Sequence, residues 1–329
     1  MYIPFQRYPM KNYLAVDSGG SKVLAILYDE EFRPVKVCRV GSMRDNTTSK
    51  DLIRRNVDTL IDTLGLAGMQ VDCVSGIVDG GLLERMKERG AVIRNVACCG
   101  ELDAGLSAAE IFEDALMALS GTGATLFYRY KGRVDGLGGY GAAISDEGSG
   151  YWMARNAFGA AIKSAEGRGP KTLLEKYISE QLGHPGNLRG ALFHIYSKTE
   201  MSPVACVASC APVVSMAAEA GDEIARDILR ETGRVLAEQL AAVVRLNHLP
   251  KDLPITISGS VWRSHRILFD EFAGFMRDFG MEREVKIPAF EPIVGVIIRH
   301  YHSIYGQFGG AERERFKEYY KDYLFSISE

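Results

Sequence analysis

Two glycine-rich turns in this 329-residue sequence have the composition of phosphate-binding loops. They are VDSGGSK (16–22) and LSGTGATL (119–126), and each stands between two runs of β-forming residues. Glycine lets backbone N–H groups approach an anion closely, while hydroxyl and ammonium groups add further donors. The residues expected to bind nucleotide phosphates are Gly19, Gly20, Ser21 and Lys22 in the first turn and Ser120, Gly121, Thr122 and Gly123 in the second.

Each turn also has a plainer interpretation. Either one alone would suit an ordinary hairpin, and neither is a Walker A loop, because the sequence holds no GxxxxGK[ST] pattern. Two such turns in one chain, both between strands, favour a different interpretation, in which each turn binds one end of a polyphosphate.

Two carboxylates stand where phosphoryl transfer would need them. Asp17 ends the first strand-like run and could hold Mg²⁺ through water, because this ion prefers oxygen ligands and keeps much of its hydration. Asp103, in GELDAGLSAAE (100–110), falls at a predicted junction of strand and helix, where it could accept the proton of an attacking hydroxyl. The alternatives are an ordinary helix N-cap at Asp103, or the same role for Glu101, two residues before the expected helix.

Two further patterns carry polar groups in glycine-bearing segments. GGYGAAISDEGSGYW (138–152) sets the acidic pair Asp146–Glu147 among glycines. ISGSVW (257–262) runs a predicted strand into Gly259 and Ser260, a common way to approach a nucleobase or ribose.

Strands and helices must position these residues, and hydrophobic periodicity predicts both. Strands are expected at 13–17, 23–29, 34–40, 71–78, 91–99, 115–121, 125–132, 133–139 and 253–262. Helices are expected at 49–65, 80–90, 103–113, 202–221, 221–249, 292–306 and 311–325. The order strand, glycine turn, strand occurs at 13–28 and again at 115–130, which indicates two related halves of an α/β fold.

The bulk composition excludes several classes of protein. A net charge of −3 gives no reason to expect nucleic acid or an anionic membrane as a partner. The six cysteines form no CxxC pair, which fits free thiols in a reducing, cytoplasmic setting. His300 and His302 would point to different sides of a helix, so a core role is expected for them rather than a metal site.

Together these motifs resemble the N-acetylglucosamine kinase and BadF/BcrA-type ATPase family, within the sugar kinase, Hsp70 and actin superfamily. VDSGGSK, LSGTGA, DAGLSAA, DEGSGYW and ISGSVW occur in that family's order. The resemblance implies two ribonuclease H-like (actin-like ATPase) domains that flank a cleft. Their expected ranges are 1–118, joined by the C-terminal helix 306–329, and 119–305. It also implies ATP and Mg²⁺ as cofactors, a small-molecule sugar as substrate, and a homodimer.

The resemblance assigns roles to individual residues. Asp103 is the implied catalytic base, and Gly259 and Ser260 form the implied adenosine turn. The implied contacts of the sugar are Asn46, Asp103, Gly139, Tyr140 and Asp146, where Asp146 could also lie on the metal side; the role of Glu147 stays open. The sequence departs from the family at Tyr140, commonly tryptophan, and at Ala124 and Thr125, which replace polar side chains near the sugar.

The implied function is an ATP-dependent kinase for a hydroxyl of an amino sugar such as N-acetylglucosamine or a related N-acetylhexosamine. Two alternatives stay open. One is an ATPase that drives an electron-transfer partner, which would need an iron–sulfur cluster for which the cysteines offer no obvious ligand set. The other is a sensor that binds sugar without turning over ATP.

Overall fold

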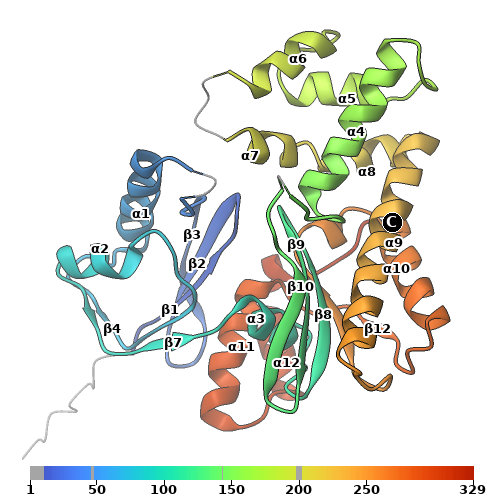
Figure 1. The fold of residues 1–329 in the computed structure, drawn as a ribbon. Coiled ribbons are helices and arrows are strands. Elements are labelled where there is room, and N and C mark those ends of the chain that lie inside the picture. The colour runs from blue at the N-terminus through green and yellow to red at the C-terminus, as the bar shows by residue number, and fades with distance from the viewer. Residues whose placement is uncertain (1–10, 46–47, 143, 198–201) are drawn as a thin grey trace, which may run out of the picture. The chain divides into compact units, whose positions relative to one another are not determined.

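A computed structural model describes residues 11–45, 48–142, 144–197 and 202–329. The chain forms two compact units (Figure 1): unit 1 is Met1–Glu110 with Pro292–Leu324, and unit 2 is Ile111–Glu291 with Phe325–Glu329. These limits differ from the expected ranges in three places, one of which is that Phe325–Glu329 belongs to unit 2 and not to unit 1. The strand after Glu110 belongs to the sheet of unit 2, so a boundary at 118 would cut it. The helix that begins at Pro292 packs within unit 1, where only the chain from 306 onward was expected.

Unit 1 is built on a five-stranded sheet of order β3-β2-β1-β5-β7. Its strands are β1 (Tyr13–Ser18), β2 (Lys22–Tyr28), β3 (Pro34–Gly41), β5 (Cys73–Ile77) and β7 (Val96–Cys98). A separate parallel pair is formed by β4 (Gln70–Val71) and β6 (Val92–Ile93). The first three strands are antiparallel neighbours, whereas β5 and β7 run parallel to β1. The carboxyl ends of β1, β5 and β7 therefore meet at one edge, where ligands of open α/β sheets commonly bind.

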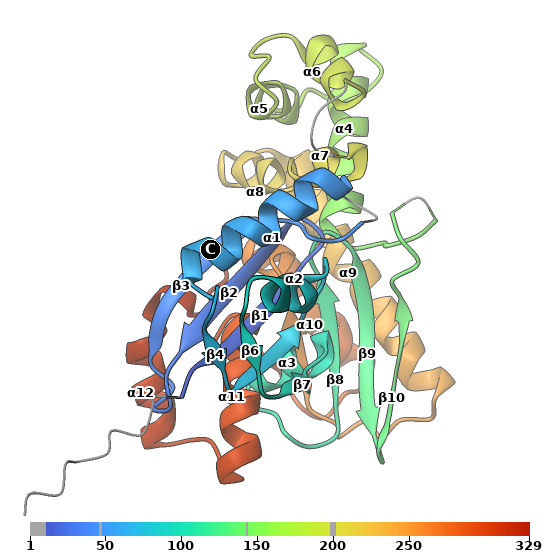
Figure 2. The same cartoon turned by 90° about the vertical axis from the view of Figure 1, so that its left-hand side faces the viewer.

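Helices cover both faces of this sheet (Figure 2). They are α1 (Lys50–Leu64), α2 (Leu82–Glu88), α3 (Glu101–Ala108), α11 (Pro292–Tyr305) and α12 (Ala311–Tyr319), followed by the short helix η2 (Lys321–Tyr323). Leu14 and Val16 point to the face where α1 packs, because alternate strand residues face opposite sides. Tyr13 lies on the other face, where its ring meets His300 of α11. His300 also bonds the Tyr28 hydroxyl at 2.6 Å, which confirms a structural role for this histidine.

Unit 2 repeats the sheet topology of unit 1, with the strand order β10-β9-β8-β11-β12. Its strands are β8 (Ala115–Ser120), β9 (Ala124–Tyr130), β10 (Arg133–Gly138), β11 (Ile255–Ser258) and β12 (Val285–Lys286). β8 and β1 have six residues each, β9 and β2 have seven, and both pairs are joined by three residues. The α/β class is thus confirmed, and the repeat expected from the sequence extends to strand order and direction.

The helices of unit 2 are more numerous than those of unit 1. They are α4 (Gly150–Ala165), α5 (Leu174–Gln181), α6 (Leu188–Ile195), α7 (Pro203–Ala208), α8 (Pro212–Glu219), α9 (Glu223–Leu246), η1 (Val261–Arg263) and α10 (Arg266–Asp278). Helices α4 to α8 extend past one end of the strands of unit 2 (Figure 1). The single helix expected over 202–221 was wrong: it is α7 and α8, because Pro212 starts a new helix. Within the described residues, no helix combines the length and apolar character needed to cross a membrane.

Candidate active site

The first glycine turn joins β1 to β2 in unit 1. It is closed by a hydrogen bond from the Gly19 N–H to the Lys22 carbonyl (2.9 Å). Gly20 is partly exposed, and Ser21 and Lys22 are exposed, as a phosphate-binding turn requires. The Ser18 hydroxyl just before the turn is buried and has no hydrogen-bond partner in the described part of the chain. An orphaned buried hydroxyl is costly, so this end of β1 has capacity for a polar ligand or water.

The second turn, between β8 and β9 in unit 2, is braced by the glycine-acidic segment. Gly121 N–H donates to the Gly123 carbonyl at 2.9 Å, and the Gly121 carbonyl accepts from Gly150 N–H at 2.7 Å. The Ser120 hydroxyl, expected to contact nucleotide, is buried and donates to the Gly148 carbonyl at 2.7 Å. Its side chain therefore shapes the turn, and the partly exposed groups are those of Gly121, Thr122 and Gly123.

Asp146 lies directly over this second turn. One carboxylate oxygen accepts a bond from Gly141 N–H at 3.2 Å, and the other lies 2.9 Å from the position that a Cβ on Gly123 would occupy. A side chain at position 123 would therefore displace the carboxylate of Asp146. Burial raises the pKa of Asp146, which is 7% exposed. Its backbone has φ +77°, an uncommon conformation that aspartate tolerates better than most residues.

The other residues predicted in this segment differ in their exposure. Gly139 has φ +73° and its N–H donates to the Ala124 carbonyl, which brings it beside the start of β9. Tyr140 is 65% exposed. Glu147 is exposed, and its carbonyl, not its carboxylate, accepts a bond from Gln239.

The predicted adenosine turn follows β11 and approaches the second glycine turn closely. A Cβ on Gly259 would lie 2.2 Å from the Ser120 carbonyl oxygen, so the two backbones touch and only glycine fits. Ser260 precedes the short helix η1, whose Trp262 is fully buried and donates Nε1–H to the Ala118 carbonyl at 3.0 Å. Unit 2 thus brings the turn at 121–123, the segment 146–150 and Gly259 together.

The predicted base, Asp103, lies at the carboxyl edge of the sheet in unit 1. It is the third residue of α3, and Gly100 is the N-cap, so the ordinary N-cap reading does not hold. Its side chain is 36% exposed, and Arg299 of α11 lies with Nη2 at 3.8 Å from Oδ1. The neighbouring Cys99 thiol has its pKa raised to about 12 by burial and then by Asp103 and, more weakly, Asp17. The carboxylates of Asp103 and Asp17 therefore both affect the Cys99 thiol.

Glu101 is placed differently from expectation. It is the first residue of α3 rather than a residue two positions before the helix. Its carboxylate accepts a hydrogen bond from Arg44 Nη2 at 3.0 Å, so it is held in an ion pair.

Arg44 is a residue that the sequence analysis did not single out. Its guanidinium donates to the Asp79 carboxylate (3.1 Å), to the Ser18 carbonyl (2.8 Å) and to Glu101. Ser18, Asp79 and Glu101 stand at the ends of, or just after, three parallel strands. No local pattern marks Arg44, because its partners lie far away in the sequence.

A cavity of about 750 Å³ opens beside Arg44 within unit 1. Its lining consists of Met43, Arg44, Asp45, Lys50, Ile53, Arg54, Val57, Asp79, Gly80, Gly81, Glu84, Arg85 and Glu88. Apolar side chains and charges of both signs share this surface, a mixture typical of sites for small polar ligands.

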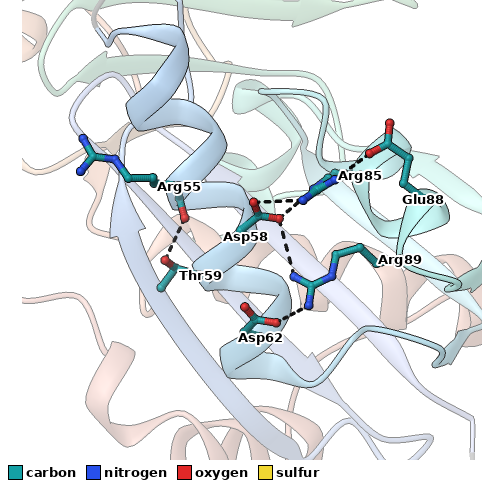
Figure 3. A network of polar contacts seen from close by, with 7 residues as sticks. All are labelled: Arg55, Asp58, Thr59, Asp62, Arg85, Glu88 and Arg89. Atoms are coloured by element: carbon teal, nitrogen blue, oxygen red, sulfur yellow. Dashed lines mark hydrogen bonds and ion pairs between the residues drawn. The ribbon is translucent and has the colours of Figure 1, made fainter.

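A network of ion pairs ties α1 to α2, the two helices that line the cavity (Figure 3). Asp58 accepts bonds from Arg85 Nε at 2.7 Å and Nη2 at 3.2 Å, and Arg89 lies 3.6 Å away. Arg89 also bonds Asp62 at 2.7 Å. The hydrogen bonds from Arg85 hold the pKa of Asp58 below its usual range. The network fixes the spacing of the two helices.

Asn46, expected to touch the sugar, lies outside the described residues. Among those that are described, no group of three or more acidic, histidine or cysteine side chains could hold a metal ion. This pattern still fits Mg²⁺ bound with a nucleotide, since that ion usually takes one or two protein carboxylates, phosphate oxygens and water. Asp17, at the end of β1 beside the first turn, is a suitable carboxylate.

Comparison with known proteins gives a consistent picture. The sequence profile of the BadF/BadG/BcrA/BcrD ATPase family matches residues 14–296. A relative from Clostridium acetobutylicum, named N-acetylmuramic acid/N-acetylglucosamine kinase, is 30% identical over 280 residues, which cover 81% of this chain and 90% of the relative.

Solved structures share the fold at lower identity. A presumed N-acetylglucosamine kinase from Porphyromonas gingivalis has a TM-score of 0.64 at 15% identity and covers 89% of this chain and 99% of its own. A ROK family glucokinase from Streptomyces griseus, solved with glucose and AMPPNP, has a TM-score of 0.53 at 18% identity, with 88% and 97% covered.

Proposed function

Because the chain belongs to the BadF/BadG/BcrA/BcrD ATPase family, we propose that it is an ATP-dependent kinase that phosphorylates a hydroxyl of an amino sugar. N-acetylglucosamine or a related N-acetylhexosamine is the expected acceptor. The observation that carries this proposal is the 30% identity to a kinase for such sugars, which extends over 90% of that relative. The two glycine turns of equal length, one in each sheet, support it.

Nucleotide binding is assigned to the glycine-rich backbone. The N–H groups of Gly20 and Ser21, with Lys22, are the proposed phosphate contacts in unit 1, and those of Thr122 and Gly123 are the proposed contacts in unit 2. The N–H groups of Gly19 and Gly121 close the two turns and so hold these donors in place. Ser120 holds the second turn in shape, and Gly259 and Ser260 approach the adenosine. Asp17 would hold Mg²⁺ through water, and the ion would supply positive charge against the phosphates. Catalysis of this kind depends mainly on positioning and on electrostatic stabilisation.

Asp103 is the proposed base. Its carboxylate orients the acceptor hydroxyl and takes its proton as the oxygen attacks the γ-phosphorus, while the bond from phosphorus to the bridging oxygen of ADP breaks. The cavity beside Arg44 lies at the same edge of the sheet and is the proposed acceptor side in unit 1. Asn46, Gly139, Tyr140 and Asp146 are kept as proposed contacts of the sugar, with Asp146 able to serve the metal side instead.

The test is ADP release from ATP and Mg²⁺ with a panel of acceptors. The panel is N-acetylglucosamine, N-acetylmannosamine, glucosamine, glucose, N-acetylmuramic acid and no sugar. Release that depends on one of the sugars is expected, and Asp103→Asn should lower kcat by about 10²- to 10⁴-fold while it leaves nucleotide binding intact. Asp270→Asn is the matched variant; Asp270 pairs with Arg266 on α10, outside the proposed site, so the parental rate should be kept.

Two results would overturn the proposal. Release that no sugar changes would point to an ATPase that acts on a protein partner; the family description names ATPase activity. Parental turnover by Asp103→Asn would reject the assigned base.

We also propose that the protein is a cytoplasmic homodimer. Six free thiols support the cytoplasmic location, the family resemblance supports the dimer, and light scattering tests the dimer.

A further inference from the structure

Arg44 joins three segments of unit 1 that come from distant parts of the sequence. Its Nη2 donates to the Ser18 carbonyl, at the start of the first glycine turn, and to Glu101, in the first turn of α3. Its Nε donates to Asp79, just after β5. The side chain is 31% exposed, and partial burial of its charge is tolerated because three acceptors surround the guanidinium.

The backbone beside Arg44 is attached to the same turn. The Ser42 hydroxyl donates to the Gly19 carbonyl at 3.3 Å and accepts from Arg44 N–H at 3.1 Å. The Ser42 carbonyl accepts from Asn56 of α1 at 2.9 Å. The segment 42–44 therefore contacts both residues that lead into the turn, and it is anchored to α1 on its other side.

We propose that Arg44 is a positioning residue for phosphoryl transfer, which fixes the first turn of α3, and with it Asp103, relative to the first phosphate turn. The inference rests on the proposed function and adds a residue to it. A guanidinium is suited to this task, because its planar array of donors holds several acceptors at fixed angles, whereas an ammonium acts as a point charge. The same contacts hold Glu101, two residues before Asp103, in an ion pair with Arg44.

The link has an electrostatic consequence that distinguishes it from a merely structural brace. The charged and titratable groups around Asp103 are Glu101 on its own helix, Arg299 on α11, the Cys99 thiol and, at the end of β1, Asp17. Loss of the Arg44 charge leaves Glu101 and Asp79 without their cation. The site then carries more negative potential, and the pH profile of kcat/KM is the readout that responds to this change.

The experiment compares the pH profiles of kcat/KM for Arg44→Gln and Arg44→Lys in the full-length protein, with the sugar that the panel identifies. Arg44→Gln should lower kcat by about 10- to 100-fold, because a small misplacement of a base is costly. It should also move the acidic limb of the pH profile to higher pH, because a positive charge is lost. Arg44→Lys should restore the position of the limb but only part of kcat, since it returns the charge without the planar fork.

Arg226→Gln is the matched control. Arg226 in α9 has a similar exposed fraction, 35%, and also bonds a backbone carbonyl, that of Ala218, and a carboxylate, that of Glu223. It has no part in the proposed site, so its variant should keep the parental kcat and pH profile.

Glu101→Gln breaks the same link from the other partner and covers the case in which Arg44→Gln does not fold. It removes a negative charge, so the acidic limb should move to lower pH, opposite to Arg44→Gln, while kcat again falls. The inference is overturned if Arg44→Gln behaves like Arg226→Gln, or if kcat falls with no movement of the limb in either variant. Absence of sugar-dependent ADP release in the parental protein would instead reject the proposed function.

Discussion

Asp146 is a carboxylate whose buried position in the fold disfavours its charged form. It is 7% exposed, it has φ +77°, and its carboxylate accepts a hydrogen bond from the Gly141 backbone N–H. Burial favours the neutral form and raises its pKa. Residues that cost stability in this way are concentrated at functional sites, which supports a role in ligand binding.

Asp146→Asn should therefore stabilise the protein while it impairs activity. Asparagine keeps the acceptor for Gly141 N–H and tolerates the left-handed backbone, but it removes the buried charge. The folded-state pKa is raised, so the penalty for ionisation is absent below about pH 4, the ordinary pKa of aspartate, and grows as pH rises through the raised pKa. Denaturant unfolding should show the variant more stable at pH 7 and equal to the parent in acid.

Activity should move in the opposite direction. Loss of a charged acceptor costs about 1.5–3 kcal/mol per hydrogen bond, so kcat/KM should fall by about 10- to 100-fold. Asp146→Ala is the control for the backbone, since alanine tolerates a positive φ poorly and should destabilise. Reduced stability of Asp146→Asn at pH 7 would show that the carboxylate holds the fold rather than a ligand.

At the scale of single residues, the sequence predicted those site residues that are marked by their neighbours in the chain. The composition of the turns and the carboxylate of Asp146 stood out, and the structure brings Asp146 onto the second turn. Arg44 could not be found in this way, since its partners are 26 and 57 residues distant. Glu101 was misplaced because the helix begins at the residue after Gly100, earlier than its apolar pattern indicates.

At the scale of elements, α3 is positioned by a close approach of α11. A Cβ on Gly295 of α11 would lie 1.9 Å from the Ala104 carbonyl oxygen and 2.8 Å from Ala108 N. The two helices thus touch through their backbones, and Ala104 is the residue after Asp103. The position of the proposed base depends on the absence of a side chain at 295.

Gly295→Ala should lower the free energy of unfolding by about 3 kcal/mol, because the clash involves backbone atoms that cannot move aside singly. It should also reduce kcat, since α3 must shift to admit the methyl group. Thermal unfolding and the ADP assay measure the two effects. Gly159→Ala, in α4 with no atom near the new Cβ, should instead be neutral or stabilise by up to about 1 kcal/mol. Equal behaviour of the two variants would contradict this account of the packing.

Much of the fold could be predicted because periodicity and turn composition are local signals. The strands that flank both glycine turns follow from alternating β-forming residues, and the repeat of unit 1 in unit 2 is visible in their order. The short strand β12 was not predicted, because two residues carry no period. The break between α7 and α8 was missed although Pro212 marks it, since the composition on both sides is uniformly apolar.

At the scale of the whole molecule, proteins that share this fold have more than one function. The matched family is described by ATPase activity, and the relative is named as a sugar kinase. A ROK family transcriptional regulator also shares the fold, with a TM-score of 0.54 at 12% identity. Fold alone therefore does not decide between turnover and sensing, and the ligands that stabilise the chain provide an independent criterion.

Linkage between binding and unfolding makes the criterion quantitative. A ligand that binds only the folded protein should raise the free energy of unfolding by about 2.7 kcal/mol at a hundred times its Kd. For a kinase we expect stabilisation by ATP and Mg²⁺ without sugar, and a further increase when the accepted sugar is added with a non-hydrolysable ATP analogue. Asp103→Asn should show the same stabilisation by nucleotide, because that change removes a base and not a phosphate contact. Stabilisation by sugar with none by nucleotide would identify a sensor, since the glycine turns would then bind no phosphate.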